Sequence, residues 1–212
     1  MRVREIETPH GPARVHLRPA DSPIGALVLG HGAGGGVGAR DLTAAADAAA
    51  ASRFSVALVE QPYRVAGRRS PAPARQLDTA WIAVVEALGA EEVAGLPLIT
   101  GGRSSGARVA CRTAEETGAQ AVLCLAFPLH PPGRADDPSK SRLSELEAVR
   151  VPVLVVQGKS DPFGMPPPGP TRKIVPVAGN HSLRSADAIE TAVSDWLQEG
   201  RAPWRDGGKS LT

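Results

Sequence analysis

The stretch Leu98-Ile99-Thr100-Gly101-Gly102-Arg103-Ser104-Ser105-Gly106-Ala107-Arg108-Val109-Ala110 joins a short apolar run to a segment that favours a helix. Its centre, Gly102 to Gly106, fits Gly-x-Ser-x-Gly, a pattern typical of a serine nucleophile on a tight turn between a strand and a helix. A Cβ two residues before or after Ser104 would collide with neighbouring backbone, which explains both glycines. The N–H of Ser105 would then face a developing oxyanion at the helix N-terminus. The stretch predicts a strand, a strained turn that presents Ser104, and a helix.

The overall composition is typical of a globular protein. With 212 residues the chain can form one large core, and we expect a single domain over 1–199 and a polar tail over 200–212. Its 24 basic and 22 acidic side chains leave a net charge of +2, which gives no indication of a nucleic-acid partner. The N-terminus is charged, and no apolar run approaches the length of a membrane span. We therefore expect a cytoplasmic protein that contacts neither nucleic acid nor membrane and that could form a homodimer.

Apolar runs alternate with helical patterns along most of the chain. Several runs are continuously apolar, as expected for strands buried on both faces of a parallel sheet. Strands are expected at 2–7, 13–17, 25–29, 55–59, 98–100, 121–126, 151–156 and 173–177, the first two as a hairpin. Helices are expected over 41–52 with Asp41 as N-cap, over 77–88, after Ser104, over 143–149 and over 189–197. The alternation predicts a mainly parallel sheet covered by helices on both faces, and the connection over 127–150 leaves no room for a lid domain.

Three chemically competent side chains follow predicted strands in the order Ser104, Asp161 and His181. The carboxyl ends of parallel strands are where the chemistry of such sheets is located. His181 could accept the Ser104 proton and return it to a leaving group, while Asp161 would fix the tautomer of His181. Each residue alone has a structural explanation, since Asp161 could begin a turn and His181 could cap a helix. Their order and positions together favour a catalytic triad.

The glycine-rich loop over 31–36 follows the strand at 25–29. Its glycines let the backbone turn sharply, so the Ala33 N–H could form an oxyanion hole with the Ser105 N–H. His31 would position this loop rather than act as a base.

The same loop also supports a dinucleotide-binding interpretation, as in an oxidoreductase. Gly30, Gly32 and Gly35 match Gly-x-Gly-x-x-Gly, and Glu60 ends the following strand. That fingerprint requires a helix that opens at the third glycine, whereas the helical pattern here begins nearer Asp41. The oxyanion hole is therefore the favoured interpretation.

Four residues near these loops are candidates for substrate binding: His31, Gly32, Arg103 and His130. Arg103, together with Arg64, Arg68 and Arg69, could attract a carboxylate-bearing ester, because arginine matches a carboxylate with two parallel hydrogen bonds. Alternatively, Arg103 braces neighbouring loops through an ion pair, and the other three are solvated. His130 could line the mouth of the site or brace a loop by a hydrogen bond. No spacing typical of a metal site is present, so no metal or cofactor is expected.

From about Val3 to Leu197 the chain resembles the α/β-hydrolase superfamily. The segments His31–Gly34, Gly101–Gly106, Phe127–Gly133 and Gln157–Gly164 are similar to those of a small, lidless branch related to dienelactone hydrolases. That branch also groups bacterial hydrolase-like proteins with a testis-expressed protein and a subunit of a histone-acetyltransferase complex. The resemblance implies the α/β-hydrolase fold, a doubly wound, mostly parallel sheet of about eight strands, and a triad of Ser104, Asp161 and His181. Dienelactone hydrolases carry a cysteine nucleophile, so Ser104 makes diene-lactone substrates unexpected.

These observations predict a serine hydrolase that cleaves a small carboxylic ester or thioester through an acyl-enzyme. The main alternative is a non-catalytic interaction protein that has kept the fold. A dinucleotide-binding oxidoreductase is the less favoured one.

Overall fold

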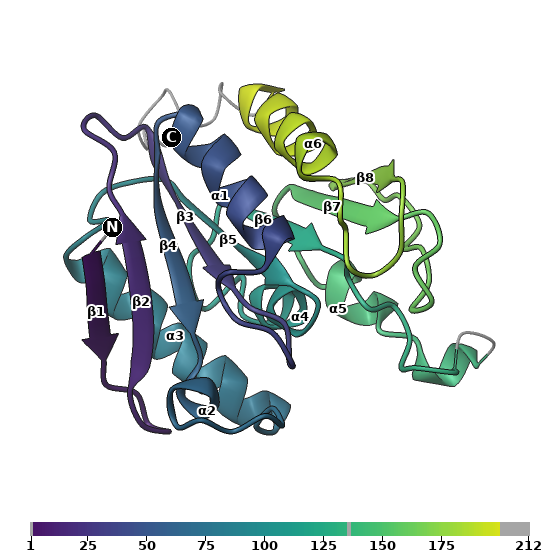
Figure 1. Ribbon diagram of the computed structural model, residues 1–212, viewed down its shortest axis with the longest axis horizontal. Helices are drawn as coiled ribbons and strands as arrows, with labels where there is room; N and C mark the ends of the chain where they lie inside the picture. The colour runs from purple at the N-terminus through teal and green to yellow at the C-terminus, as the bar shows by residue number, and fades with distance from the viewer. Residues whose placement is uncertain (1, 135–136, 200–212) are drawn as a thin grey trace, which may run out of the picture.

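An eight-stranded sheet runs through the computed structural model, which describes residues 2–134 and 137–199 (Figure 1). The strand order is β1-β2-β4-β3-β5-β6-β7-β8; β1–β2 and β2–β4 pair antiparallel, and the remaining neighbours pair in parallel. The strands are β1 Arg2–Ile6, β2 Ala13–Arg18, β3 Gly25–Gly30, β4 Phe54–Glu60, β5 Leu98–Arg103, β6 Ala121–Leu125, β7 Val153–Gly158 and β8 Arg172–Val177. The expected α/β-hydrolase sheet, with its N-terminal hairpin, is confirmed.

The central strands are buried on both faces, which is why their sequences do not alternate between apolar and polar residues. Every residue of β3 and β6 is buried. In β3, Leu27 and Leu29 pack into the core on one face, whereas Ala26 and Val28 pack into the core on the other. Because successive side chains of a strand point to opposite faces, a run of apolar residues fills both layers.

Helices cover both faces of the sheet, as predicted. α1 Arg40–Ala51 and α6 Ala186–Glu199 lie side by side on one face, and α3 Ala74–Ala90 and α4 Ser105–Arg112 cover the other (Figure 1). The apolar positions expected to face the core are buried in α3 and in α6. They are Leu77, Ala80, Trp81, Val84, Val85 and Leu88 in α3, and Ile189, Ala192, Val193, Trp196 and Leu197 in α6.

The expected N-cap of α1 is wrong by two residues. Ala39 is the N-cap, and Asp41 lies in the first turn. The Asp41 carboxylate accepts the Leu42 N–H and pairs with Arg103, so it stabilises the helix N-terminus from inside rather than as the cap. β7 begins at Val153 instead of Val151, after Pro152, which lacks a main-chain donor.

Two short helical segments, α2 and η1, were not predicted, whereas the short helix expected over 143–149 is present as α5. α2, Pro62–Val65, follows β4, and its signal was Pro62 at the first helical position. Between β6 and β7 lie the 3₁₀ turn η1, Pro138–Lys140, and α5, Leu143–Glu147, where one short helix was expected. The fold has no lid domain, as predicted, within the described ranges. The predicted polar tail over 200–212 lies outside the described residues.

No helix within residues 2–134 and 137–199 is long and apolar enough to cross a membrane.

Candidate active site

Ser104 occupies a strained turn between β5 and α4. Its φ of +52° and ψ of −108° lie outside the regions that an L-residue ordinarily adopts, so the surrounding structure must impose them. A Cβ added to Gly102 or to Gly106 would lie 2.4 Å from the main-chain oxygen of Gly30 in each case. The collision expected from the sequence is therefore present, and both glycines allow β5, α4 and β3 to approach closely enough to form this turn.

The three predicted triad residues meet at one edge of the sheet. Ser104 Oγ lies 3.0 Å from His181 Nε2, and His181 Nδ1 lies 2.8 Å from Asp161 Oδ2. Ser104 follows β5, Asp161 follows β7 and His181 follows β8, so the carboxyl ends of three parallel strands bring them together. With the proton on Nδ1 donated to the carboxylate, Nε2 is free to accept the serine proton. This hydrogen-bond order is the one in which a serine hydroxyl becomes a nucleophile.

Asp161 is held by donors besides His181. Its side chain is buried, Oδ1 accepts the Phe163 N–H at 2.9 Å, and Oδ2 accepts Gln157 Nε2 at 2.9 Å. Gln157 is fully buried at the end of β7, and its Nε2 also lies 2.9 Å from the Gly164 carbonyl. Sequence analysis did not identify Gln157 as part of the site. Its signal was a polar residue at the end of an otherwise apolar strand.

An aromatic contact restricts the histidine. The Phe163 ring packs against the His181 ring, with centroids 4.3 Å apart and planes inclined by 50°. Because the Phe163 N–H also bonds to Asp161, one residue helps to orient both members of the pair.

The predicted oxyanion loop, residues 31–36, is held by contacts with the end of β4 and the start of α2. Buried His31 accepts the Gln61 N–H on Nε2 at 3.1 Å, which leaves the proton on Nδ1 to donate to the Gly32 carbonyl at 2.8 Å. Burial lowers the pKa of His31, which favours this neutral tautomer. Since the C=O and N–H of a trans peptide point in opposite directions, the bond to the Gly32 carbonyl also fixes the direction of the Ala33 N–H.

A hydrogen bond from α2 also holds this loop. Tyr63 in α2 donates its hydroxyl to the Ala33 carbonyl at 2.9 Å, and burial raises the pKa of Tyr63, so this donor stays protonated. A Cβ on Gly32 would lie 3.5 Å from the Ser104 Cβ, so the loop passes directly beside Ser104. Within the described part of the chain, the N–H groups of Ala33 and Ser105 donate no hydrogen bond. Both candidate donors of the oxyanion hole therefore remain available.

Arg103, a candidate for substrate binding, joins the end of β5 to α1 and to the loop that carries His181. Its Nε donates to Asp41 Oδ2 at 2.6 Å, and Nη2 donates to the His181 carbonyl at 3.1 Å. A Cβ on Gly32 would lie 2.8 Å from Nη1, so only glycine fits beside the guanidinium without movement. Asp41 is 1% exposed, and burial raises its pKa while Arg103 opposes that shift. Arg103 therefore forms a bracing ion pair, the alternative to substrate binding that the sequence analysis considered.

His130 lies beside the Asp161 loop, close to Gly164. Its N–H donates to the Phe163 carbonyl at 2.9 Å, and its carbonyl accepts Arg142 Nη1 at 3.3 Å. The imidazole Nδ1 is buried and finds no hydrogen-bond partner among the described residues. His130 therefore forms loop-bracing hydrogen bonds through its backbone N–H and carbonyl.

The dinucleotide interpretation finds no support in this geometry. α1 begins at Arg40, well beyond Gly35, so no helix N-terminus stands over the glycine-rich turn. The Glu60 carboxylate lies 3.5 Å from His16 Nε2 and 3.6 Å from Arg14 Nη1, and thus contacts β2. Among the residues described, no group of three or more His, Cys, Asp and Glu side chains is placed to hold a metal ion.

Comparisons with known proteins agree with the fold. The α/β-hydrolase domain family matches residues 23–200. A serine hydrolase without a lid from Xanthomonas campestris is 21% identical, with a TM-score of 0.70 over 96% of this chain and 94% of that one. Est1E from Butyrivibrio proteoclasticus is 16% identical, with a TM-score of 0.74 over 94% of this chain and 99% of that one. A dienelactone hydrolase from Anabaena variabilis is 15% identical, with a TM-score of 0.72 over 93% of this chain and 96% of that one. No curated protein matches the sequence significantly.

Proposed function

Because the chain belongs to the α/β-hydrolase domain family, we propose that it is a serine hydrolase that cleaves a small carboxylic ester or thioester. The observation that carries this proposal is the continuous hydrogen-bonded chain from Ser104 Oγ through His181 to Asp161. The relatives described as serine hydrolases support the general class, and the specific substrate and residue roles are our inference.

In the first half-reaction, Ser104 Oγ attacks the carbonyl carbon of the substrate while His181 Nε2 takes the hydroxyl proton. The bond to the leaving oxygen or sulfur then breaks, and His181 donates that proton to the leaving group. In the second half-reaction, water attacks the acyl-enzyme, His181 accepts a proton from the water, and the proton returns to Ser104 as the acid departs. Asp161 keeps His181 in the required tautomer throughout and stabilises its cationic form.

The negative charge that develops on the carbonyl oxygen needs donors. We assign this role to the main-chain N–H groups of Ala33 and Ser105. Loss of one such donor typically costs about 2.7–4 kcal/mol of transition-state stabilisation. His31 holds the Gly32 carbonyl, and Tyr63 holds the Ala33 carbonyl of the next peptide. Both contacts support this assignment, because preorganised donors need not reorient during the reaction.

We also infer that the chain belongs to the small, lidless branch related to dienelactone hydrolases, the one that includes the testis-expressed protein and the histone-acetyltransferase subunit. The short η1–α5 connection supports a substrate site open to solvent. Ser104 in place of a cysteine argues against diene-lactone substrates.

A fluorophosphonate probe, which reacts with activated serines, tests the proposal. Wild type should be labelled, Ser104→Ala should not, and His181→Ala should react much more slowly. Ser105→Ala is the matched control, because it removes a neighbouring hydroxyl but keeps the main-chain N–H. Failure of folded wild type to react, together with no hydrolysis of short p-nitrophenyl esters, would contradict the proposal and favour an interaction protein.

A further inference from the structure

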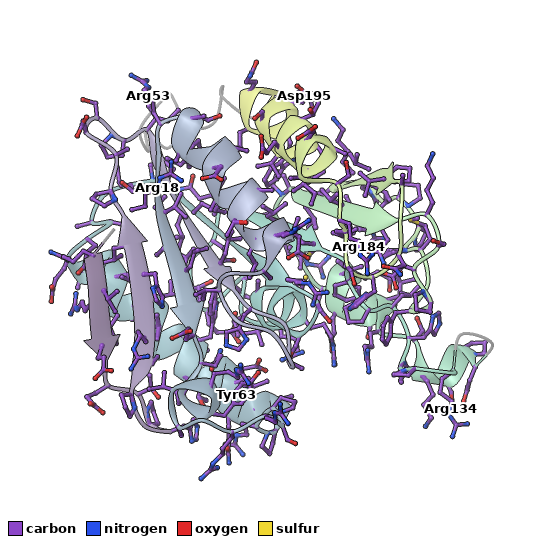
Figure 2. The ribbon with its side chains drawn as sticks, in the orientation of Figure 1. Arg18, Arg53, Tyr63, Arg134, Arg184 and Asp195 are labelled. Atoms are coloured by element: carbon purple, nitrogen blue, oxygen red, sulfur yellow. The ribbon has the colours of Figure 1, made fainter. Side chains whose placement is uncertain are left out.

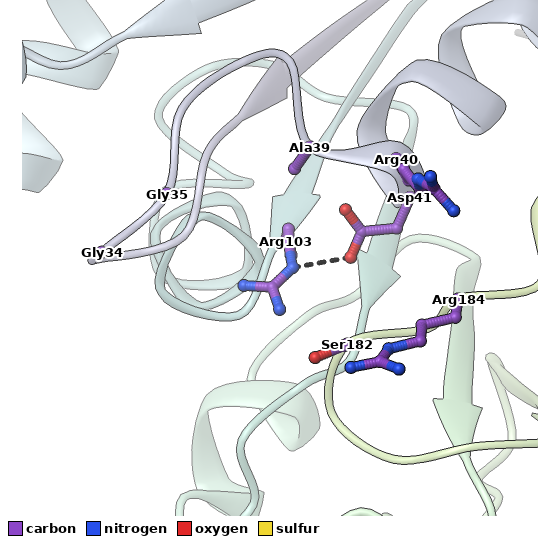
Figure 3. Close-up of a pocket in the computed structure, with 8 residues that line it drawn as sticks. All are labelled: Gly34, Gly35, Ala39, Arg40, Asp41, Arg103, Ser182 and Arg184. Carbon is purple, nitrogen blue, oxygen red and sulfur yellow. Dashed lines mark hydrogen bonds and ion pairs between the residues drawn. The ribbon is translucent and has the colours of Figure 1, made fainter.

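A pocket of about 660 Å³ is lined in part by the sequence neighbours of Ser104 and His181. Gly34, Gly35, Arg40, Arg103, Ser182 and Arg184 line it (Figure 3). Arg103 precedes Ser104, Ser182 follows His181, and Gly34 follows Ala33. The same three loops that supply the nucleophile, the histidine and the oxyanion donor thus also form the walls of this pocket.

The pocket carries an excess of positive charge. Three of its lining residues are arginines, and Asp41 supplies the one carboxylate among them. That carboxylate is engaged by Arg103 at 2.6 Å. Neither Arg40 nor Arg184 forms a hydrogen bond or an ion pair through its side chain with any other described residue. Two exposed guanidinium groups therefore remain without a counter-charge in a pocket that the loops of Ser104 and His181 help to form.

The two unpaired arginines come from different elements. Arg184 lies on the loop before α6 (Figure 2). Its side chain extends back toward Ser182 in the pocket that the Arg103–Asp41 pair also lines (Figure 3). Arg40 begins α1 and flanks Asp41 on the other side. Arginine stays protonated at all physiological pH values, and its planar fork matches a carboxylate or another oxyanion with paired hydrogen bonds. An anion here would supply the counter-charge that Arg40 and Arg184 lack.

We propose that Arg40 and Arg184 bind an anionic group of the substrate, so that the ester or thioester cleaved at Ser104 carries a carboxylate or a comparable oxyanion. This inference rests on the proposed hydrolase function and adds its substrate class. It replaces the arginine set expected from the sequence. Arg64, Arg68 and Arg69 lie on α2 and the loop after it, and none of them lines this pocket in the described structure.

Matched esters test the proposal. The p-nitrophenyl esters of glutaric acid and of valeric acid have acyl chains of equal length, but only the first ends in a carboxylate. The glutaramate ester adds a neutral polar control. Wild type should cleave the glutarate ester with a kcat/KM about tenfold or more above that of either neutral ester, as expected for charge-assisted hydrogen bonds. A second pair, butyrates of 4-hydroxybenzoate and of 4-hydroxybenzamide, tests an anion on the leaving group instead.

Substitutions then assign the preference to the pocket. Arg184→Gln, and more strongly Arg184→Gln with Arg40→Gln, should remove the preference while changing kcat/KM for the valerate ester by less than about twofold. Arg69→Gln, an exposed arginine on the other loop, should leave the preference intact. Calorimetric titration of Ser104→Ala with glutarate measures anion binding in the absence of turnover. This binding should be lost when Arg40→Gln and Arg184→Gln are added.

The outcomes separate the two proposals. Cleavage of the valerate ester that depends on Ser104, with no preference for an anion in either ester pair, would overturn the anionic-substrate inference and leave the hydrolase function standing. A preference that survives in the double variant but is lost in Arg69→Gln would move the anion site to the α2 loop and overturn our assignment. Absence of any Ser104-dependent hydrolysis would overturn the proposed function itself.

Discussion

Arg103 donates a hydrogen bond from Nη2 to the main-chain carbonyl of His181 over 3.1 Å. The residue before the candidate nucleophile thus holds the residue that would activate it. Nε of the same guanidinium pairs with Asp41 in α1. One side chain therefore connects the turn that presents Ser104, the loop that carries His181 and the N-terminus of α1. The Ser104–His181 distance therefore depends on a residue that need not touch the reacting atoms.

Removal of this guanidinium should destabilise the fold as well as the site. Arg103→Met leaves the Asp41 carboxylate buried and unpaired, which we expect to lower the free energy of unfolding by about 3–5 kcal/mol. The double variant Arg103→Met with Asp41→Asn should recover a large part of that loss, because no charge is then left in the core. Urea unfolding of the four members of this cycle provides the measurement. Losses that simply add would show that the two side chains do not act as a pair.

The close approach of β3 and α4 predicts opposite effects for two glycine substitutions. Gly106→Ala places a Cβ 2.4 Å from the Gly30 oxygen, so β3 or α4 must shift, and both stability and esterase activity should fall. Gly89→Ala in α3 meets no atom within 4 Å, and it should stabilise the protein by about 0.5–1 kcal/mol. Thermal unfolding of both variants compares them directly. Equal stability of Gly106→Ala and wild type would mean that this contact is not tight.

The sequence predicted those features of the fold and the site that depend only on local residue pattern and on the order of residues along the chain. The apolar runs over 25–29 and 121–126 predict buried strands because continuous hydrophobicity is needed on both faces. Ser104, Asp161 and His181 could be placed together without coordinates, because each follows a strand and parallel strands end at one edge.

What the sequence did not reveal depends on contacts between distant segments. Tyr63 meets the Ala33 carbonyl only because β4 lies next to β3, and no local pattern encodes that contact. Aspartate is a residue type that favours the N-cap position, but the Asp41 carboxylate instead forms a tertiary ion pair with Arg103. Arg40 and Arg184 are far apart in the chain and ordinary in sequence, and only the fold brings them to one pocket.

The anchoring of the oxyanion loop predicts a rate effect at Tyr63. Tyr63→Phe removes the hydroxyl that holds the Ala33 carbonyl but preserves the aromatic body. We expect kcat for an ester to fall by about tenfold with little change in KM, since a misplaced oxyanion donor acts in the transition state. Fluorophosphonate labelling should slow in parallel, while the melting temperature should drop only slightly. An unchanged kcat would show that His31 alone fixes the loop.

His31 should make stability depend on pH in a defined direction. Burial lowers its pKa below the value near 6.5 of the unfolded chain, so on acidification the unfolded state binds a proton before the native state does. The contribution of neutral His31 is therefore complete above about pH 6.5 and is lost as the pH falls toward the folded pKa, with a slope of up to about 1.4 kcal/mol per pH unit. The difference in unfolding free energy between wild type and His31→Gln should shrink between about pH 7.5 and about pH 5.5. Urea unfolding across that range measures it, with His10→Gln, at an exposed histidine, as the control for losing one imidazole. A difference that stays constant with pH would show that His31 takes up its proton equally readily in the folded and unfolded chain.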